Sequence, residues 1–244
     1  MLCRFRLLLL LLPLPLLGQS VPFSFRHLQE SAGLSHKLVN CLFRDRDGFL
    51  WVGTYGGLNR FDGSHFTVFR YHPRRPETLG SNIVHAIDQD AQGFLWLATE
   101  AGISRLDPAT GRFRNFHTAY GHNLGMCLNL VCDRQGNVWF SSRGRGLFQY
   151  DPVRNQFRQF VAKPGRTASL SNNFVSKNGL LRDDRRNGLW IATEKGLNFL
   201  DLTTHRLRNH QTDSRPGALF SPNYTSGLTL NGDTLLYADN TAER

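Results

Sequence analysis

Hydrophobic residues in this chain fall into short runs separated by polar turn residues, and the order of these runs repeats. In each repeat an apolar run is followed by an aspartate and a glycine, which is typical of a tight turn in which glycine takes a positive φ. A second run carries a tryptophan, and a third segment alternates apolar and polar residues with period two. The pattern predicts short antiparallel strands and argues against a helical bundle.

Four copies of this arrangement follow one another in register, at intervals of about 45 residues. Their tryptophans are Trp51, Trp96, Trp139 and Trp190. We take the turn aspartates to be Asp45, Asp90, Asp133 and Asp184. The first strands are predicted at residues 39–43, 83–87, 128–131 and 175–181. Four strands per copy predict the blade of a β-propeller, in which the tryptophans and phenylalanines fill the space between successive blades.

The repeats divide the chain into blades at about 33–70, 79–117, 122–161 and 170–210, with a partial fifth in 219–244. Residues 23–28 match the pattern of a fourth strand, and residues 234–238 that of a second strand in the fifth unit. Both are expected to be unpaired edge strands. We therefore expect an all-β propeller of four complete blades plus a partial fifth, arranged as an open arc and not a closed ring.

The motif Asp-x-x-Gly-x-Leu-Trp-Val-Gly-Thr, at residues 45–54, is followed by Gly-Leu-Asn-Arg-Phe-Asp at residues 57–62. This motif resembles the two-component regulator propeller repeat. That repeat builds the periplasmic sensor region of hybrid two-component histidine kinases, mainly in Bacteroidetes. The resemblance implies a sensor of a saccharide fragment. Members continue into more blades, an immunoglobulin-like domain, a membrane helix and a kinase. The chain is thus expected to be truncated, with the remaining blades or a sensor kinase as its partners.

The N-terminus has the features of a secretory signal peptide. Arg4 and Arg6 precede an apolar run at residues 7–17, and Gly18 and Ser20 supply small residues for cleavage. The run is too short to span a bilayer, and no later stretch reaches the length that a membrane span requires. We expect residues 1–20 to be removed and the protein to be exported to the periplasm, which makes a nucleic-acid role improbable.

Composition and charge narrow the interpretation further. The chain is 40% hydrophobic, which excludes a disordered protein. Its net charge of +10 is spread along the sequence and indicates a solvated surface, with no dedicated anionic partner such as nucleic acid. Three cysteines remain after the signal peptide, Cys41, Cys127 and Cys132, all in apolar contexts. They are expected to be buried hydrophobic residues, and a Cys127–Cys132 bridge is the alternative.

Candidate binding residues lie in the loops that surround the propeller axis. The loops between second and third strands carry Tyr55, Glu100, Arg143, Arg145, Glu194 and Lys195, and the linkers before first strands carry Asn82, Asn123 and Asn173. These positions differ from copy to copy, whereas packing would repeat one residue type. Amides and charged groups suit sugar hydroxyls and anionic groups, and Arg143 and Arg145 are expected to clamp an anion together. Alternatively they are variable surface residues, with asparagines that cap turns.

Signals for an enzyme are weak. The histidines show no metal-binding spacing, and no nucleophile elbow or phosphate loop is present, so we expect no catalytic residues, no metal and no cofactor. An exported propeller enzyme is the alternative, because residues 136–140 with Asp151-Pro152 also resemble the repeats of streptogramin lyases. The resemblance to lyases and lactonases implies a histidine and acidic residues at the axis. His36, His85 or His122 would then lie next to Glu100 or Glu194. In our alignment of the copies, however, Cys41 and Ser176 occupy the position of His85, which argues against a cluster of histidines.

Overall fold

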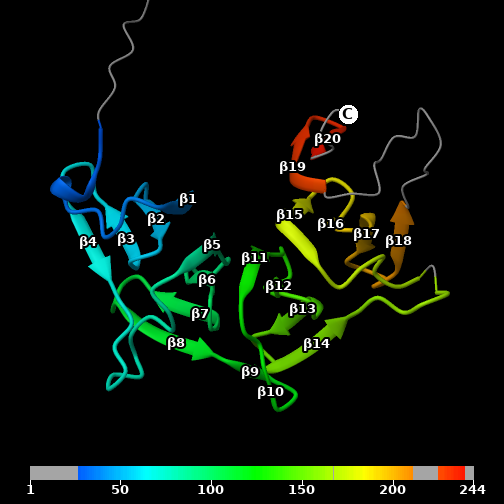
Figure 1. Ribbon diagram of the computed structural model, residues 1–244, viewed down its shortest axis with the longest axis horizontal. Coiled ribbons are helices and arrows are strands. Elements are labelled where there is room, and N and C mark those ends of the chain that lie inside the picture. The colour runs from blue at the N-terminus through cyan, green and yellow to red at the C-terminus, as the bar shows by residue number, and fades with distance from the viewer. Residues whose placement is uncertain (1–26, 167, 211–224, 240–244) are drawn as a thin grey trace, which may run out of the picture.

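The computed structural model describes residues 27–166, 168–210 and 225–239. Within these ranges the chain forms four four-stranded antiparallel sheets and two sheets of two strands. The four larger sheets follow one another along an open arc, which Figure 1 shows from the first blade at the left to the fourth at the right. The all-β propeller architecture predicted from the sequence is therefore confirmed, including its open form.

The strands follow the chain in simple order. The first blade contains β1 (Val39–Arg44), β2 (Leu50–Thr54), β3 (Leu58–Phe61) and β4 (Phe66–Phe69). The second contains β5 (Val84–Gln89), β6 (Leu95–Thr99), β7 (Gly102–Asp107) and β8 (Arg112–Phe116). The third contains β11 (Cys127–Cys132), β12 (Val138–Ser142), β13 (Gly146–Asp151) and β14 (Gln156–Phe160). The fourth contains β15 (Val175–Asp183), β16 (Gly188–Thr193), β17 (Gly196–Asp201) and β18 (Leu207–His210).

Smaller elements complete the described chain. A short 3-10 helix, η1 (Glu30–Ala32), precedes the first blade, and the hairpin β9 (Thr118–Ala119) with β10 (His122–Asn123) lies between the second and third. The fifth unit is seen as β19 (Thr225–Asn231) paired with β20 (Thr234–Asp239). The first strands of successive blades lie side by side on the inside of the arc, in the order β1, β5, β11, β15, β19 (Figure 1).

A hydrogen bond between an aspartate and a tryptophan fixes each blade at its first turn. Asp45 accepts from the indole Nε1 of Trp51 at 2.6 Å, and the corresponding bonds in the second and third blades are both 2.7 Å long. In the fourth blade the acceptor is Asp183, whose Oδ2 lies 3.1 Å from Trp190 Nε1, so the assignment of Asp184 as the equivalent turn aspartate was wrong. The fourth turn is one residue longer. Asp184 instead forms an ion pair with Arg182, in which Asp184 Oδ1 lies 2.9 Å from Arg182 Nε.

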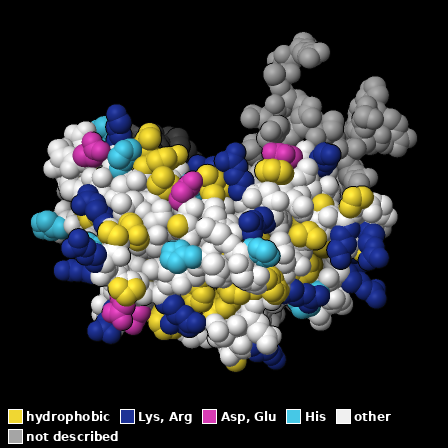
Figure 2. All heavy atoms as spheres, turned by 60° about the horizontal axis from the view of Figure 1, so that its bottom comes forward, with side chains coloured by type: hydrophobic (Ala, Val, Ile, Leu, Met, Phe, Trp, Pro, Cys, Tyr) yellow, Lys and Arg dark blue, Asp and Glu magenta, His cyan; other side chains and the backbone are white. Residues whose placement is uncertain are grey.

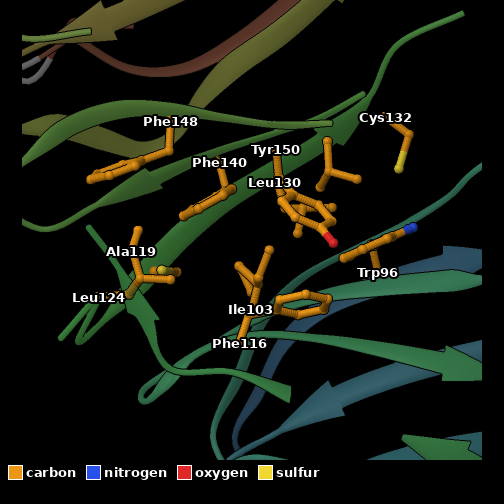
Figure 3. Packing of buried hydrophobic residues seen from close by; sticks show 13 residues of the cluster. Trp96, Ile103, Phe116, Ala119, Leu124, Leu130, Cys132, Phe140, Phe148 and Tyr150 are labelled. Carbon is orange, nitrogen blue, oxygen red and sulfur yellow. The ribbon is translucent and has the colours of Figure 1, made fainter. Parts of the chain in front are cut away.

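The core lies between the blades, where aromatic rings of adjacent sheets meet. Figure 3 shows Trp96 and Phe116 of the second blade facing Tyr150 of the third. The centroid of the Tyr150 ring lies 5.7 Å from that of Trp96 and 4.8 Å from that of Phe116. Three of the repeated tryptophans are fully buried, whereas Trp190 is partly exposed. The predicted role in packing between blades is thus confirmed for Trp51, Trp96 and Trp139.

Several other expectations can be compared with the described residues. Cys41, Cys127 and Cys132 are free thiols, so the alternative of a Cys127–Cys132 bridge was wrong.

The signal peptide at 1–20 and most of the N-terminal strand predicted at 23–28 fall outside the described residues, and His27 and Leu28 are not in a strand. Lys and Arg side chains are scattered over the face seen in Figure 2. In the described ranges, no helix has the length and hydrophobicity needed to cross a bilayer.

Candidate functional site

The innermost strand of each blade contains a β-bulge near its start. In the first blade, Val39 pairs with Thr54 and Cys41 with Gly53, so that Asn40 has no residue opposite. The same interruption leaves His85 as the extra residue of β5 and Leu128 as that of β11. A bulge re-aims one side chain out of the regular alternation of a strand. Because the first strands line the inside of the arc, the bulges bring these side chains to the propeller axis.

The bulge of the fourth blade is longer than the others. Ser176–Gly179 lie between Val175, which pairs with Thr193, and Leu180, which pairs with Ile191. Asn178 takes a φ of 55° there, and a Cβ on Gly179 would come within 2.6 Å of the carbonyl oxygen of Ser176. The tight turn of the backbone therefore requires glycine at position 179 and leaves Ser176 and Lys177 beside the axis.

These bulges border a cavity of about 520 Å³, which we call the axial pocket. The bulges contribute Asn40, His85, Leu128, Ser176 and Lys177. The surrounding loops and strand ends contribute Tyr55, Met126, Arg143, Phe174, Val175 and Glu194. The volume lies within the range of small-molecule sites, and the lining combines apolar and aromatic side chains with a few polar groups, as is usual for such sites.

Three side chains of the axial pocket keep a buried polar atom without a hydrogen-bond partner among the described residues. The atoms are Asn40 Nδ2, His85 Nδ1 and Ser176 Oγ. Leaving such an atom unpaired costs about 1–3 kcal/mol, so native proteins contain few of them. Only one further unpaired atom of this kind, Asn209 Oδ1, occurs in the described ranges. All three belong to side chains that line one cavity, although each atom is itself shielded from solvent, and this makes the cavity a candidate site for a partner that turns these side chains inward.

Ionisable groups fix two of the bulge side chains. The Nε2 atom of His85 lies 2.9 Å from Glu100 Oε2, and His85 is only 7% exposed. In the neutral ring, a proton on Nε2 completes this contact and leaves Nδ1 as an acceptor. Lys177 Nζ donates to Asn40 Oδ1 at 3.4 Å, which joins the fourth blade to the first across the axis. The pocket therefore offers a donor, an acceptor and a positive charge from three different blades.

The residues that sequence analysis proposed for binding separate into distinct groups. Tyr55, Arg143 and Glu194 line the axial pocket, and Glu100 reaches its edge through His85. Arg145 lines a different cavity of about 320 Å³, together with His122. Arg143 and Arg145 thus do not form one clamp, because the turn at Gly144, with a φ of 71°, directs them into separate cavities.

A larger cavity of about 790 Å³ adjoins the axial pocket, and we call it the rim pocket. It shares Phe174 and Glu194 with the axial pocket. Its cationic side chains are Lys163, Arg166 and Lys195. Asn173 and Asn209 also line it. The two pockets therefore form neighbouring compartments on the side of the propeller that carries the loops between second and third strands.

The three predicted asparagines are engaged in local structure. Asn82 accepts from the backbone N–H of Tyr71 at 2.8 Å, and Asn123 from that of Gly125 at 2.8 Å. Asn173 accepts from the backbone N–H of Ala162 at 2.7 Å. Each bond holds a linker that leads toward a first strand. These contacts favour the alternative that the asparagines serve turns, with Asn173 alone also facing a pocket.

Sequence analysis missed Asn40, Leu128, Ser176 and Lys177. The counterpart of His85 in the first blade is Asn40 and not Cys41, because the bulge falls at the same distance before the turn aspartate in the first three blades. Counting back five residues from that aspartate could have found Asn40 and Leu128, but not Ser176 and Lys177, because the bulge of the fourth blade is longer. Of the histidines, His85 alone meets one of the proposed acids within the described ranges, where no group of three or more potential metal ligands occurs.

Comparison with known proteins extends these observations. The family described as "Two component regulator propeller" matches residues 33–56 and 78–101. Over 62 residues, 25% of the chain, the sequence is 40% identical to a protein named Histidine kinase P4 from Formosa agariphila, of which this stretch covers 4%. The chain thus spans a small fraction of that relative.

Similar solved structures show the same fold. The extracellular domain of a protein described as a one-component system from B. thetaiotaomicron has a TM-score of 0.66 at 22% identity, over 82% of this chain and 28% of that one. A domain described as part of a hybrid two-component system from the same organism has a TM-score of 0.58 at 21% identity, over 87% and 34%. An inactive virginiamycin B lyase from Staphylococcus aureus has a TM-score of 0.58 at 13% identity, over 82% and 76%.

Proposed function

We propose that this chain, a member of the two-component regulator propeller family, is a ligand-sensing domain that binds a saccharide fragment in its axial pocket. The family match and the relative named as a histidine kinase support a role in signal transduction with a kinase as partner. The extracellular domains with the same fold support a location outside the cytoplasm. Binding, and not catalysis, is the function proposed for the pocket.

The observation that carries this proposal is the cluster of unpaired buried atoms on the bulges. Asn40 Nδ2 can only donate, and Ser176 Oγ can donate or accept. In the neutral ring of His85 that donates from Nε2 to Glu100, Nδ1 accepts. Sugar hydroxyls both donate and accept, so they can pair with each of the three atoms once these buried side chains turn toward the pocket. A ligand with acceptors alone would leave His85 unpaired.

Aromatic side chains at the mouth of the axial pocket also support the proposal of a saccharide ligand. Tyr55 is 44% exposed and Phe174 is 43% exposed, although both are large and largely apolar. Such rings can pack against the C–H face of a sugar while polar neighbours bind its hydroxyls. The combination of an aromatic wall and paired donors and acceptors is what a saccharide requires.

An exported propeller enzyme is the second candidate, and one contact favours it. The His85–Glu100 pair has the geometry of a base oriented by a carboxylate, and the virginiamycin B lyase shares the fold. Incubating the protein with each ligand that binds, and analysing the mixture by mass spectrometry, distinguishes the two functions. A sensor returns the ligand unchanged, whereas turnover that is lost in His85→Ala would establish an enzyme.

Export is part of the proposal and has its own test. The apolar run at residues 7–17 and the small residues before Val21 support cleavage after Ser20. Mass spectrometry of the protein recovered from the periplasm should give an N-terminus at Val21. A protein that still begins at Met1 would overturn this part of the proposal.

Ligand binding is tested by a thermal-shift screen of neutral and acidic oligosaccharides, followed by calorimetry with the best ligand. Tyr55→Ala should weaken binding about tenfold, a loss of about 1.4 kcal/mol. Tyr71→Ala is the matched control, because Tyr71 is 48% exposed but lines neither pocket. Failure of every saccharide to bind, or equal losses in the two variants, would contradict the proposal.

A further inference from the structure

We infer that the ligand is an anionic oligosaccharide that spans both pockets, with one negatively charged group in each and a sugar ring against Phe174 between them. This inference rests on the proposed function and deepens it. It depends on three features of the described residues: the charges of the pockets, the position of Phe174, and the separation of Arg143 from Arg145.

Positive charge exceeds negative charge in each pocket. Arg143 and Lys177 line the axial pocket, and Lys163, Arg166 and Lys195 line the rim pocket. The only carboxylate that lines either pocket in the described ranges is Glu194, which they share. None of the five cations forms an ion pair with a described carboxylate. Each pocket therefore has cationic groups available for a carboxylate or sulfate of a ligand.

Phe174 forms the boundary between the two pockets and is held there by its neighbours. Its backbone N–H donates to Asn172 Oδ1 at 2.7 Å, and its carbonyl accepts from the backbone N–H of Glu194 at 3.0 Å. The ring packs over Gly144, where an added Cβ would lie 3.1 Å from the ring. An exposed aromatic ring on a hydrogen-bonded backbone, between two cationic cavities, suits a sugar unit whose neighbours carry the charges.

Glu194 complements this arrangement. Its backbone is fixed by the bond to Phe174, and its side chain lines both pockets beside the aromatic ring. A carboxylate can only accept, so it binds hydroxyl groups and repels anionic groups at the boundary. The expected ligand therefore presents hydroxyls at Phe174 and anionic groups on either side.

Calorimetry with three tetrasaccharides built on galactose tests the inference. The probes are tetragalacturonate, a sulfated carrageenan tetrasaccharide and neutral galactotetraose, each at about 50 and about 300 mM NaCl. We expect at least one anionic probe to bind about tenfold more tightly than the neutral one, with affinity that falls as salt is added. The carboxylated and sulfated probes identify which anionic group the site prefers. Equal affinity for the neutral probe, or binding that salt does not weaken, would overturn the inference.

Three substitutions that each remove one positive charge separate site binding from general attraction. Arg143→Ala removes a positive charge from the axial pocket, and Lys195→Ala removes one from the rim pocket. Arg145→Ala removes the same charge from the same loop as Arg143, but from a cavity outside both pockets. The first two should each weaken anionic binding about tenfold, and the third less than about twofold. Equal losses in all three would show that only net charge matters and would overturn the inference.

The proposed function and this inference fail in different ways. Neutral galactotetraose that binds as tightly as the anionic probes, with a loss in Tyr55→Ala, would leave the saccharide sensor standing and remove the anionic ligand. No binding by any of the three probes or the wider saccharide screen would contradict both. Circular dichroism of each variant confirms that the blades remain folded, so a loss of affinity is not a loss of structure.

Discussion

Asn129 of the third blade holds the bulge of the fourth, because its amide bonds both ends of that bulge. Its Nδ2 donates to the carbonyl oxygen of Ser176 at 2.9 Å, and its Oδ1 accepts from the backbone N–H of Gly179 at 3.1 Å. Asn129 itself is buried and lies next to the bulge residue of its own blade. One side chain thus connects the packing between blades to the position of Ser176 and Lys177 in the axial pocket.

Removal of this amide should affect both stability and binding. Asn129→Ala leaves two buried backbone groups without partners, so the free energy of unfolding should fall by about 1–3 kcal/mol. Ligand affinity should also fall, because the bulge loses its support. Asn115→Ala is the control, since the Asn115 amide bonds the carbonyl of Thr78 at 2.8 Å in the second blade, outside the axial pocket. Urea titration and calorimetry should show destabilisation in both variants and weaker binding only in Asn129→Ala.

Ser176 and Ser142 should respond in opposite ways to the loss of a hydroxyl. Ser176 Oγ is buried without a partner, so Ser176→Ala should leave the free energy of unfolding unchanged or raise it by up to about 1 kcal/mol. Ser142 Oγ donates to the carbonyl of Leu124 at 2.6 Å, so Ser142→Ala should lower it by about 1–2 kcal/mol. Ligand binding should weaken in Ser176→Ala. A clear loss of stability there would mean that the hydroxyl serves the fold.

Tryptophan substitutions should depend on the blade. Trp96 is fully buried against the third blade and bonds Asp90 at 2.7 Å, so Trp96→Ala should lower the free energy of unfolding by about 3–5 kcal/mol. Trp190 is partly exposed and bonds Asp183 at 3.1 Å, so Trp190→Ala should cost less. Urea titration of both variants measures the difference. A cost below about 0.5 kcal/mol at Trp96 would contradict its place in the core.

Asp88 should make stability depend on pH. Burial raises the pKa of its carboxyl, and the backbone N–H groups of Cys132 and Gln89 and the charges of Arg182 and Arg46 offset this only in part. A raised pKa in the folded state contributes stability that is fully present below the ordinary value of about 3.9 and is lost as the pH rises through the raised pKa.

Comparison with Asp88→Asn isolates this contribution, because the amide does not titrate. The free energy of unfolding of the native protein, minus that of Asp88→Asn, should decrease as the pH rises from about 4 to about 7. Chemical denaturation at several pH values gives both quantities. A difference that is constant across this range, or that grows, would show that the pKa of Asp88 is not raised.

The fold could be predicted from the sequence because its signals are local and repeated. Each turn aspartate is followed by a tryptophan at a fixed distance, and this pair bonds within its own blade, as Asp45 and Trp51 do. The fourth blade shows the limit of such a signal. Its turn has one extra residue and begins with two consecutive aspartates, Asp183 and Asp184. Only the structure shows that Asp183, and not Asp184, accepts the hydrogen bond from Trp190.

The site was only partly predictable because it depends on register. A bulge is a mismatch between paired strands, so the exposure of Asn40 or Lys177 at the axis follows from which residues face each other and not from residue type. The loop residues Tyr55 and Glu194, which line the axial pocket, were proposed from the sequence because loops vary visibly between copies. Arg145 shows the opposite case, because a glycine with positive φ turned it away from Arg143.

The central claim is that the β-bulges of the inner strands form the ligand site. A crystal structure of the protein with the saccharide that binds most tightly tests it most directly. Ligand density is expected in the axial pocket, with hydrogen bonds between the ligand and both His85 Nδ1 and Ser176 Oγ. Density for the ligand elsewhere on the blades, with both atoms still unpaired, would contradict it.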